Sequence, residues 1–137
     1  MKQHLQILTG VLLIALLVSS CSKEPATPGG TVKKWIHAIE NQDAATLMAI
    51  TAMPEGQPSF SEDQWKELII PDVVKEIQDK EGIKEISIEE EQYNNEKIAP
   101  GHAFVQYSIT YNNGEADRSE SMSLVKKEGT WKVIMGE

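Results

Sequence analysis

The sequence predicts an α+β domain in which helices come first and a four-stranded antiparallel sheet follows. Between residues 31 and 82, apolar side chains recur every three or four positions, which is the period of an amphipathic helix. After Gly82 the period changes to two, as in a strand with one buried face. Asn112-Asn113-Gly114, between two alternating segments, is typical of a hairpin turn. Helices followed by a meander of strands is the pattern of an α+β fold.

Residues 1–20 precede this domain and predict a secretory signal peptide. Lys2 supplies the positive start, the apolar run extends from Leu5 to Val18, and two small serines come before Cys21. A transmembrane helix needs roughly 20 predominantly apolar residues, so this interrupted run is too short to span a bilayer. No cluster of positive residues follows it to stop its transfer.

Val18-Ser19-Ser20-Cys21 resembles the bacterial lipobox. The resemblance implies that the Cys21 thiol is diacylated, that the preceding peptide is removed, and that the new amino terminus is acylated. Each buried methylene adds about 0.8 kcal/mol of membrane affinity, and two or more chains make a stable anchor. We expect a membrane-anchored protein of the bacterial cell envelope, in the outer membrane and facing the periplasm or the surface. The alternatives are an ordinary secreted protein and a cytosolic domain with a buried cysteine.

Residues 21–30 predict the lipidated cysteine and a flexible tether, because two prolines and two glycines lie among polar residues. The α+β domain then occupies residues 31–137. Cys21 is the only cysteine, so the domain has no internal disulfide. The formal net charge of −8 disfavours nucleic acid and direct attraction to anionic lipid.

The helices are predicted from their caps and apolar stripes. Thr31 is the expected N-cap of the first helix, and Asp43 of a short second helix. Ser61 and Gln64 match a capping box, Pro71 suits the first turn of a further helix, and Gly82 is a natural stop. The stripe of the first helix consists of Val32, Trp35, Ile36 and Ile39.

Four strands are predicted, at Ile83–Ile88, Ala103–Tyr111, residues 115–127 and Thr130–Met135, with a loop from Tyr93 to Gly101. Alternation places one set of side chains of the second strand on the inner face. That set consists of Val105, Tyr107, Ile109 and Tyr111.

Three stretches, Thr31–Asp43, Phe104–Gly114 and Leu124–Val133, resemble the nuclear transport factor 2-like superfamily, and within it small bacterial lipoproteins with a domain of unknown function. The resemblance implies N-terminal helices packed in the concave face of a curved four-stranded antiparallel sheet. The superfamily includes ketosteroid isomerases, dehydratases, polyketide cyclases and many non-enzymatic binding domains. The fold therefore does not select a function.

Four aromatic residues are the candidate lining of a ligand pocket at the mouth of this cone: Trp35, Tyr107, Tyr111 and Trp131. The alternative is that they are core residues. Isomerase chemistry would need a carboxylate base inside the cone. The sequence offers no evident one, since each aspartate falls at a helix start or a turn. Those considered are Asp43, Asp63, Asp72 and Asp117.

Other catalytic or metal chemistry finds little support, so no catalytic residue, cofactor or metal is expected. His37 and His102 have no metal-ligand spacing, although dehydratases of the resembled fold use a His–Asp pair. Glu89–Glu91 lacks the pattern of a calcium loop and suits a solvated strand end. The alternating serines 119, 121 and 123 lack a nucleophile motif and suit an exposed strand face.

Three functions remain open. The favoured one is a lipid-anchored, non-catalytic domain that binds a small apolar ligand, a peptide or a partner protein. The second is an enzyme of the isomerase or dehydratase type that uses the cone pocket. The third is a homodimer that assembles through its sheet.

Overall fold

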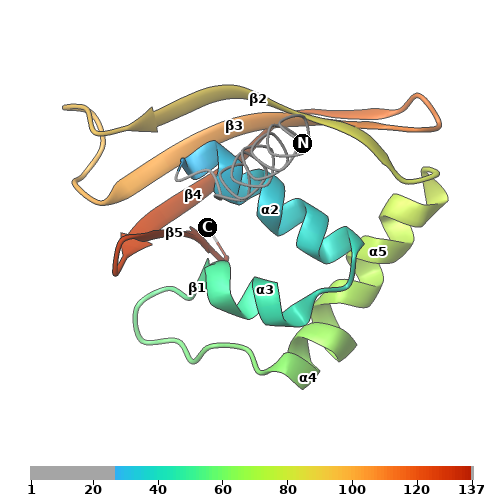
Figure 1. Cartoon of the computed structure of the whole chain (residues 1–137), viewed down its shortest axis with the longest axis horizontal. Coiled ribbons are helices and arrows are strands. Elements are labelled where there is room, and N and C mark those ends of the chain that lie inside the picture. The colour runs from blue at the N-terminus through green and yellow to red at the C-terminus, as the bar shows by residue number, and fades with distance from the viewer. Residues whose placement is uncertain (1–26, 137) are drawn as a thin grey trace, which may run out of the picture.

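The computed structural model describes residues 27–136 (Figure 1). The predicted signal peptide, Cys21 and most of the predicted tether lie outside the described residues, so those assignments stay predictions. The helices are α2 (Pro28–Glu40), α3 (Ala44–Ile50), α4 (Glu62–Gln64), a π-helical turn (Trp65–Ile69) and α5 (Ile70–Asp79). The strands are β1 (Thr51–Ala52), β2 (Ile83–Tyr93), β3 (His102–Tyr111), β4 (Ala116–Lys127) and β5 (Thr130–Ile134).

Within the described residues the strands form one sheet in the order β1-β5-β4-β3-β2. The four predicted strands are present, and β2 to β5 pair as an antiparallel meander. The fifth strand, β1, was not predicted, because two residues are too few to show an alternation. It pairs in parallel with β5, through Thr51 with Val133 and Ala52 with Ile134. The expected α+β class is confirmed, with five strands instead of four.

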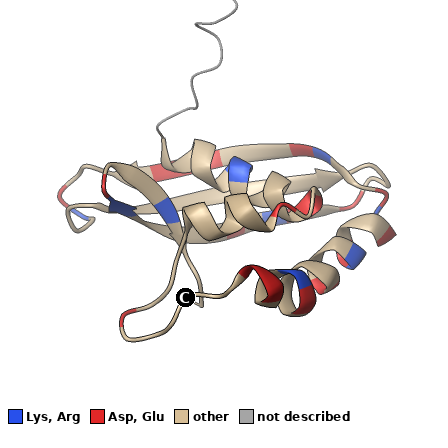
Figure 2. Cartoon of the chain, turned by 60° about the horizontal axis from the view of Figure 1, so that its bottom comes forward, with Lys and Arg blue, Asp and Glu red and all other residues tan. Residues whose placement is uncertain are grey.

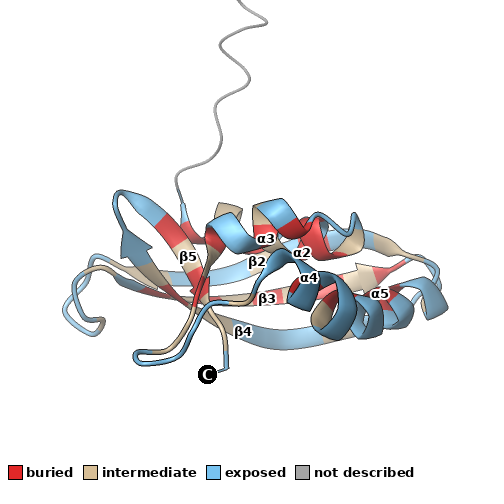
Figure 3. Cartoon of the chain, turned by 90° about the horizontal axis from the view of Figure 1, so that it is seen from below, coloured by how far each residue is buried: buried red, intermediate tan, exposed pale blue. Residues whose placement is uncertain are grey.

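The helices all lie against one face of the curved sheet (Figure 1). Helix α2 packs directly on β2, β3 and β5, and α3 and α5 pack in turn against α2. Buried positions gather where these helices and the sheet face one another (Figure 3). The most deeply buried large side chains are Val32, Ile39, Leu47, Trp65, Ile70, Val105 and Leu124.

Helix α2 begins four residues earlier than the sequence predicts. Thr27, not Thr31, is the N-cap, and its side-chain oxygen accepts a hydrogen bond of 3.1 Å from the Gly30 amide. Pro28 takes the first helical position, where its missing N–H costs nothing. Residues 28–30 therefore belong to the helix and not to the tether.

A carboxylate of the sheet also stabilises this helix start. The Gly29 amide donates a hydrogen bond of 2.5 Å to Glu91 Oε1. A negative charge is favourable at a helix N-terminus, where unpaired amides carry partial positive charge. A Cβ on residue 29 would collide with the Glu91 carboxylate, so the close approach requires glycine. The contact anchors α2 to the far end of β2.

The second helical region follows its predicted caps. Asp43 accepts a bond of 3.1 Å from the Thr46 amide, and Ser61 and Gln64 form the reciprocal capping box. Pro71 lies in the first turn of α5, as predicted. The wider π-helical turn precedes it and buries Trp65. Gly82, at φ +88°, ends the region in the left-handed conformation that glycine adopts without strain.

Strand β2 continues to Tyr93, five residues beyond the predicted end at Ile88. The alternation of its sequence fails there because a bulge lies between Ile88 and Glu90. None of the helices within residues 27–136 combines the length and the hydropathy that a membrane crossing requires.

Candidate functional site

A pocket of about 340 Å³ lies between α2, α5 and the inner face of β3 and β4. Its volume is near the lower end of the range found for small-molecule sites. Most of the lining residues are apolar or aromatic, and the other three carry carboxylates. The lining consists of Trp35, Ile36 and Ile39 from α2, Val73, Glu76 and Ile77 from α5, Tyr107, Ile109 and Tyr111 from β3, and Asp117, Glu120 and Met122 from β4.

Trp35 forms one wall of the pocket and is fixed on its other side. Its indole Nε1 donates a hydrogen bond of 3.0 Å to Thr51 Oγ1. Its ring meets that of Trp65 edge to face, with centroids 6.4 Å apart. The indole is half-buried and immobilised by these contacts, so it presents a rigid apolar surface to the pocket.

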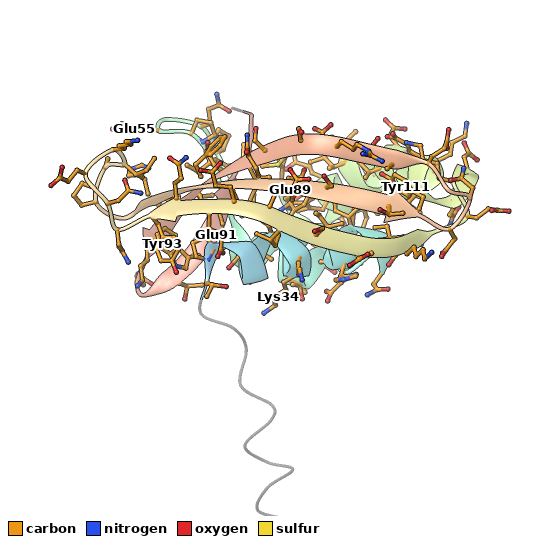
Figure 4. All side chains as sticks on the ribbon, turned by 90° about the horizontal axis from the view of Figure 1, so that it is seen from above. Lys34, Glu55, Glu89, Glu91, Tyr93 and Tyr111 are labelled. Atoms are coloured by element: carbon orange, nitrogen blue, oxygen red, sulfur yellow. The ribbon has the colours of Figure 1, made fainter. Side chains whose placement is uncertain are left out.

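Tyr107 and Tyr111 both lie on β3, and because they are four residues apart their side chains point to the same face of the strand. Both are buried and both face the helices, as the sequence predicts. Figure 4 shows Tyr111 near the end of the sheet opposite Tyr93 and Glu91. The pocket therefore lies toward the β3–β4 turn and away from the start of α2.

A bulge in β4 places two carboxylates in the pocket. Tyr107 is paired with Glu120 and Ile109 with Asp117, so Ser108 alone faces two residues of β4. One of these two, Ser119, adopts φ +57°, a left-handed conformation that is uncommon outside glycine. Residues three apart on a regular strand face opposite sides, but the extra residue turns both acidic side chains to the inner face.

Asp117 belongs to a bonded network with Tyr111 and Lys80. The Tyr111 hydroxyl donates a hydrogen bond of 2.6 Å to Asp117 Oδ2. Lys80 Nζ lies 3.6 Å from Asp117 Oδ1 and 3.1 Å from Glu76 Oε1, and 4.6 Å from the centre of the Tyr111 ring. Two carboxylates and an aromatic face thus hold one ammonium group. The hydrogen bond to Glu76 raises the pKa of Lys80, and burial followed by the bond to Asp117 raises the pKa of Tyr111.

Tyr107 and Glu120 form a second pair that lacks such partners. Within residues 27–136 nothing hydrogen-bonds to the Tyr107 hydroxyl and no cation pairs with Glu120. Tyr107 is 7% exposed, and its hydroxyl is not sealed from the pocket. Burial, with the charges of Glu120 and Asp117, raises its pKa to about 12. The hydroxyl is therefore protonated at neutral pH and open to a ligand.

Of the four aromatic residues predicted to line a pocket, Trp35, Tyr107 and Tyr111 come together and Trp131 does not. Trp131 lies at the other end of the sheet, where its ring meets Tyr93 with centroids 5.8 Å apart. Lys126 Nζ lies 5.6 Å from the centre of the same ring. The prediction failed for Trp131 because β5 pairs with the far end of β4, beyond the pocket.

Asp117, Glu120 and Glu76 are pocket residues that the sequence reasoning missed. Asp117 was assigned to a turn, and the bulge that redirects it cannot be read from an alternation. Glu120 is two residues before Met122, which also lines the pocket, so strand alternation was a signal for Glu120 in the sequence. Glu76 lies one position before the buried Ile77 of α5.

The other groups considered from the sequence lie outside the pocket. His37 is exposed, with Nδ1 3.7 Å from Glu40 Oε1, and His102 is exposed at the start of β3. Glu89 accepts a hydrogen bond from Ser108, and Glu91 caps α2. Among residues 27–136 no three His, Cys, Asp or Glu side chains lie close enough to hold a metal ion. Acidic and basic residues are otherwise spread over the helices, strands and loops (Figure 2).

Comparisons with known proteins bear on the fold. No family model matches the chain, and no curated protein matches it. A crystal structure described as a nuclear transport factor 2-like transpeptidase, from Campylobacter jejuni, is similar with a TM-score of 0.59 and 18% identity, over 77% of this chain and 94% of that one. A solution structure of a SEC-C motif containing protein from Rhodopseudomonas palustris is similar with a TM-score of 0.52 and 15% identity, over 86% of this chain and 83% of that one. At these identities the likeness concerns the fold alone.

Proposed function

We propose that this chain, whose described domain has the nuclear transport factor 2-like fold, is a lipid-anchored envelope protein that binds a small molecule in the pocket between α2, α5 and the sheet. The observation that supports it most is the pocket of about 340 Å³, in which apolar walls converge on a few polar groups. That combination is typical of small-molecule sites, where apolar area supplies affinity and polar groups fix orientation.

The pocket composition defines the ligand's general shape. Trp35, Ile39 and Ile109 offer apolar area for a ring or short chain, and the hydroxyl of Tyr107 offers one hydrogen-bonding group beside it. The small volume favours a compact ligand over a long acyl chain. The ligand thus has an apolar body and one polar end.

Binding without catalysis fits the bonding of the polar groups. A general base needs a free lone pair within hydrogen-bond reach of the substrate proton. Asp117 already accepts the Tyr111 hydroxyl and lies beside the Lys80 ammonium, so its charge is stabilised where it is. Proton abstraction by Asp117 would have to disturb both contacts.

The second candidate function is an enzyme of the isomerase or dehydratase type. One observation favours it: Tyr111 and Asp117 form an acid–base pair at 2.6 Å inside the cone. A substrate that displaced Lys80 would leave the carboxylate available. Turnover of a candidate substrate that is lost in Asp117→Asn, while the same substrate still binds, would favour this function over the first.

Indole NMR signals test the binding function directly. The three tryptophans give three indole N–H peaks. Of the three, Trp35 lines the pocket, and Trp65 and Trp131 do not. Titration of the ¹⁵N-labelled full-length chain with 2-phenylethanol should shift the Trp35 peak saturably and leave the Trp131 peak in place. Trp35→Phe assigns the peak. Unchanged peaks, or equal shifts of Trp35 and Trp131, would contradict the proposal.

The anchor is tested separately because it depends on Cys21 alone. Cys21→Ser removes the thiol that the lipid needs, so the chain should leave the detergent-extractable membrane fraction. Ser22→Ala, the adjacent small polar residue, is the matched control and should stay with the membrane. Unchanged partitioning of Cys21→Ser would contradict the anchor and leave the binding function unaffected.

A further inference from the structure

We propose that the ligand of this pocket is an organic ammonium, whose charged nitrogen lies between Glu120 and Tyr107 while its apolar part lies against Trp35. This inference rests on the binding function proposed above and adds the chemical class of the ligand.

The pocket has more negative than positive charge. Its lining includes Glu76, Asp117 and Glu120, and the one cation in contact with these groups among the described residues is Lys80. Lys80 contacts the first two carboxylates. Glu120 is thus left with no cation partner inside residues 27–136. An anionic ligand would be repelled by this arrangement, and a cationic one would complete it.

Tyr107 supplies a second, independent indication of a ligand at the same place. It is paired directly with Glu120 across β3 and β4, a separation at which Cβ atoms lie roughly 5 Å apart. Its side chain is more than nine-tenths buried, yet its hydroxyl has no partner among the described residues and opens into the pocket. Because the hydroxyl is reachable from the pocket, water or a ligand can hydrogen-bond to it there. A ligand nitrogen beside Glu120 would donate to this oxygen.

The chain already binds one ammonium group of its own, that of Lys80, in the way proposed for the ligand. The Lys80 ammonium is held by Asp117, Glu76 and the face of the Tyr111 ring. The Glu120–Tyr107 pair repeats two of these elements, a carboxylate and a tyrosine, a few residues along the same two strands. Cations are attracted to aromatic faces as well as to carboxylates, most strongly where water is excluded. The Lys80 ammonium occupies the first group of side chains, whereas Glu120 and Tyr107 have no such cation among the described residues.

A metal ion is a poorer fit than an organic cation. The described carboxylates are not grouped closely enough for three of them to bind one ion. Most of the pocket wall is also apolar, which a hydrated metal ion would not use. An ammonium with an attached ring or short chain uses both parts of the pocket.

Three probes of similar size separate charge from shape: 2-phenylethylammonium, 2-phenylethanol and 3-phenylpropanoate. Calorimetric titration of the full-length chain should show about threefold tighter binding of the ammonium than of the alcohol, since Glu120 is exposed and an ion pair with an exposed carboxylate adds on that order. The carboxylate should bind weakest. Equal affinity for ammonium and alcohol would overturn the ammonium inference and leave the binding function standing. Binding of none of the three would overturn both.

Two variants locate the charged site. Glu120→Gln should remove the preference for ammonium over alcohol, and Tyr107→Phe should reduce ammonium affinity severalfold. Glu85→Gln is the matched control, because Glu85 is exposed and paired with Thr110, on the other face of the same sheet. It removes the same charge and should keep the full preference. A preference that survives Glu120→Gln, or is equally lost in Glu85→Gln, would contradict the assigned position.

Discussion

Asp117 and Glu120 are three residues apart on β4 and both face the pocket, because a bulge at Arg118–Ser119 lies between them. On a regular strand one of the two would point to the opposite face of the sheet. The bulge therefore determines the charge of the pocket. It also brings Asp117 within hydrogen-bond distance of Tyr111 and pairs Tyr107 with Glu120 in the strand register.

Ser119 is the residue on which the bulge depends. Its φ of +57° suits glycine and is unfavourable for a β-branched side chain. Ser119→Val should therefore lower the free energy of unfolding by on the order of 1–3 kcal/mol, while Ser119→Gly should leave it unchanged or raise it slightly. Urea denaturation followed by circular dichroism measures both.

Ser121→Val is the control for that comparison. Ser121 is exposed and pairs with Gln106 in the regular part of β4, where valine fits a strand well. Equal destabilisation by Ser119→Val and Ser121→Val would contradict a special role for the bulge.

The two inward tyrosines of β3 should respond differently to loss of their hydroxyls. Tyr111→Phe removes a bond to a charged acceptor and should cost about 1 kcal/mol of stability, because Asp117 is partly exposed to water. Tyr107→Phe removes a hydroxyl that has no partner among the described residues and should cost less. Urea denaturation of the two single variants makes the comparison, and a larger loss for Tyr107→Phe would refute it.

Alkaline pH should weaken the fold through these tyrosines. The pKa of Tyr107 is raised from 10.0 to about 12, so the folded chain holds this proton more tightly than the unfolded chain. The resulting stabilisation is present in full below pH 10 and is lost as the pH rises from 10 toward 12. The free energy of unfolding should fall across this window, and Tyr107→Phe should make the fall shallower. An unchanged slope in Tyr107→Phe would contradict the raised pKa.

Lys80 should compete with the proposed ligand for negative charge. Lys80→Gln frees Asp117 and Glu76 from their ammonium partner and makes the pocket more negative. We expect about threefold tighter binding of 2-phenylethylammonium, in line with partly exposed ion pairs, and little change for 2-phenylethanol. The matched control is Lys66→Gln, since Lys66 pairs with Glu62 on the exposed side of α4. Weaker ammonium binding in Lys80→Gln would show that Lys80 supports the site instead of competing for it.

Much of the fold was predictable because local chemistry agreed with the tertiary structure. The capping box at Ser61 and the stop at Gly82 were each readable from residue type and spacing and are confirmed. The inward face of β3 was predictable because its alternation is unbroken over the strand. The start of α2 was mispredicted because Pro28 and Gly29 suggest a linker by composition. In the helix the Gly29 amide donates to Glu91, which is distant in sequence, so this contact is not visible locally.

The site was less predictable than the fold. Helical and strand periodicity predicts that Trp35, Tyr107 and Tyr111 face inward. It determines the face on which a side chain lies but not its position along the sheet. Trp131 fits the same periodicity and lies at the far end, because the pairing of β5 with β4 places it there. Asp117 could not be found from an alternation, since it reaches the pocket through the bulge.

A crystal structure of the full-length chain with 2-phenylethylammonium would show whether Glu120 and Tyr107 bind an ammonium group in this pocket. We expect the nitrogen within about 3 Å of both the Glu120 carboxylate and the Tyr107 hydroxyl, a normal hydrogen-bond distance, with the ring against Trp35. A nitrogen directed into solvent, or a ligand bound elsewhere on the chain with this pocket empty, would contradict it.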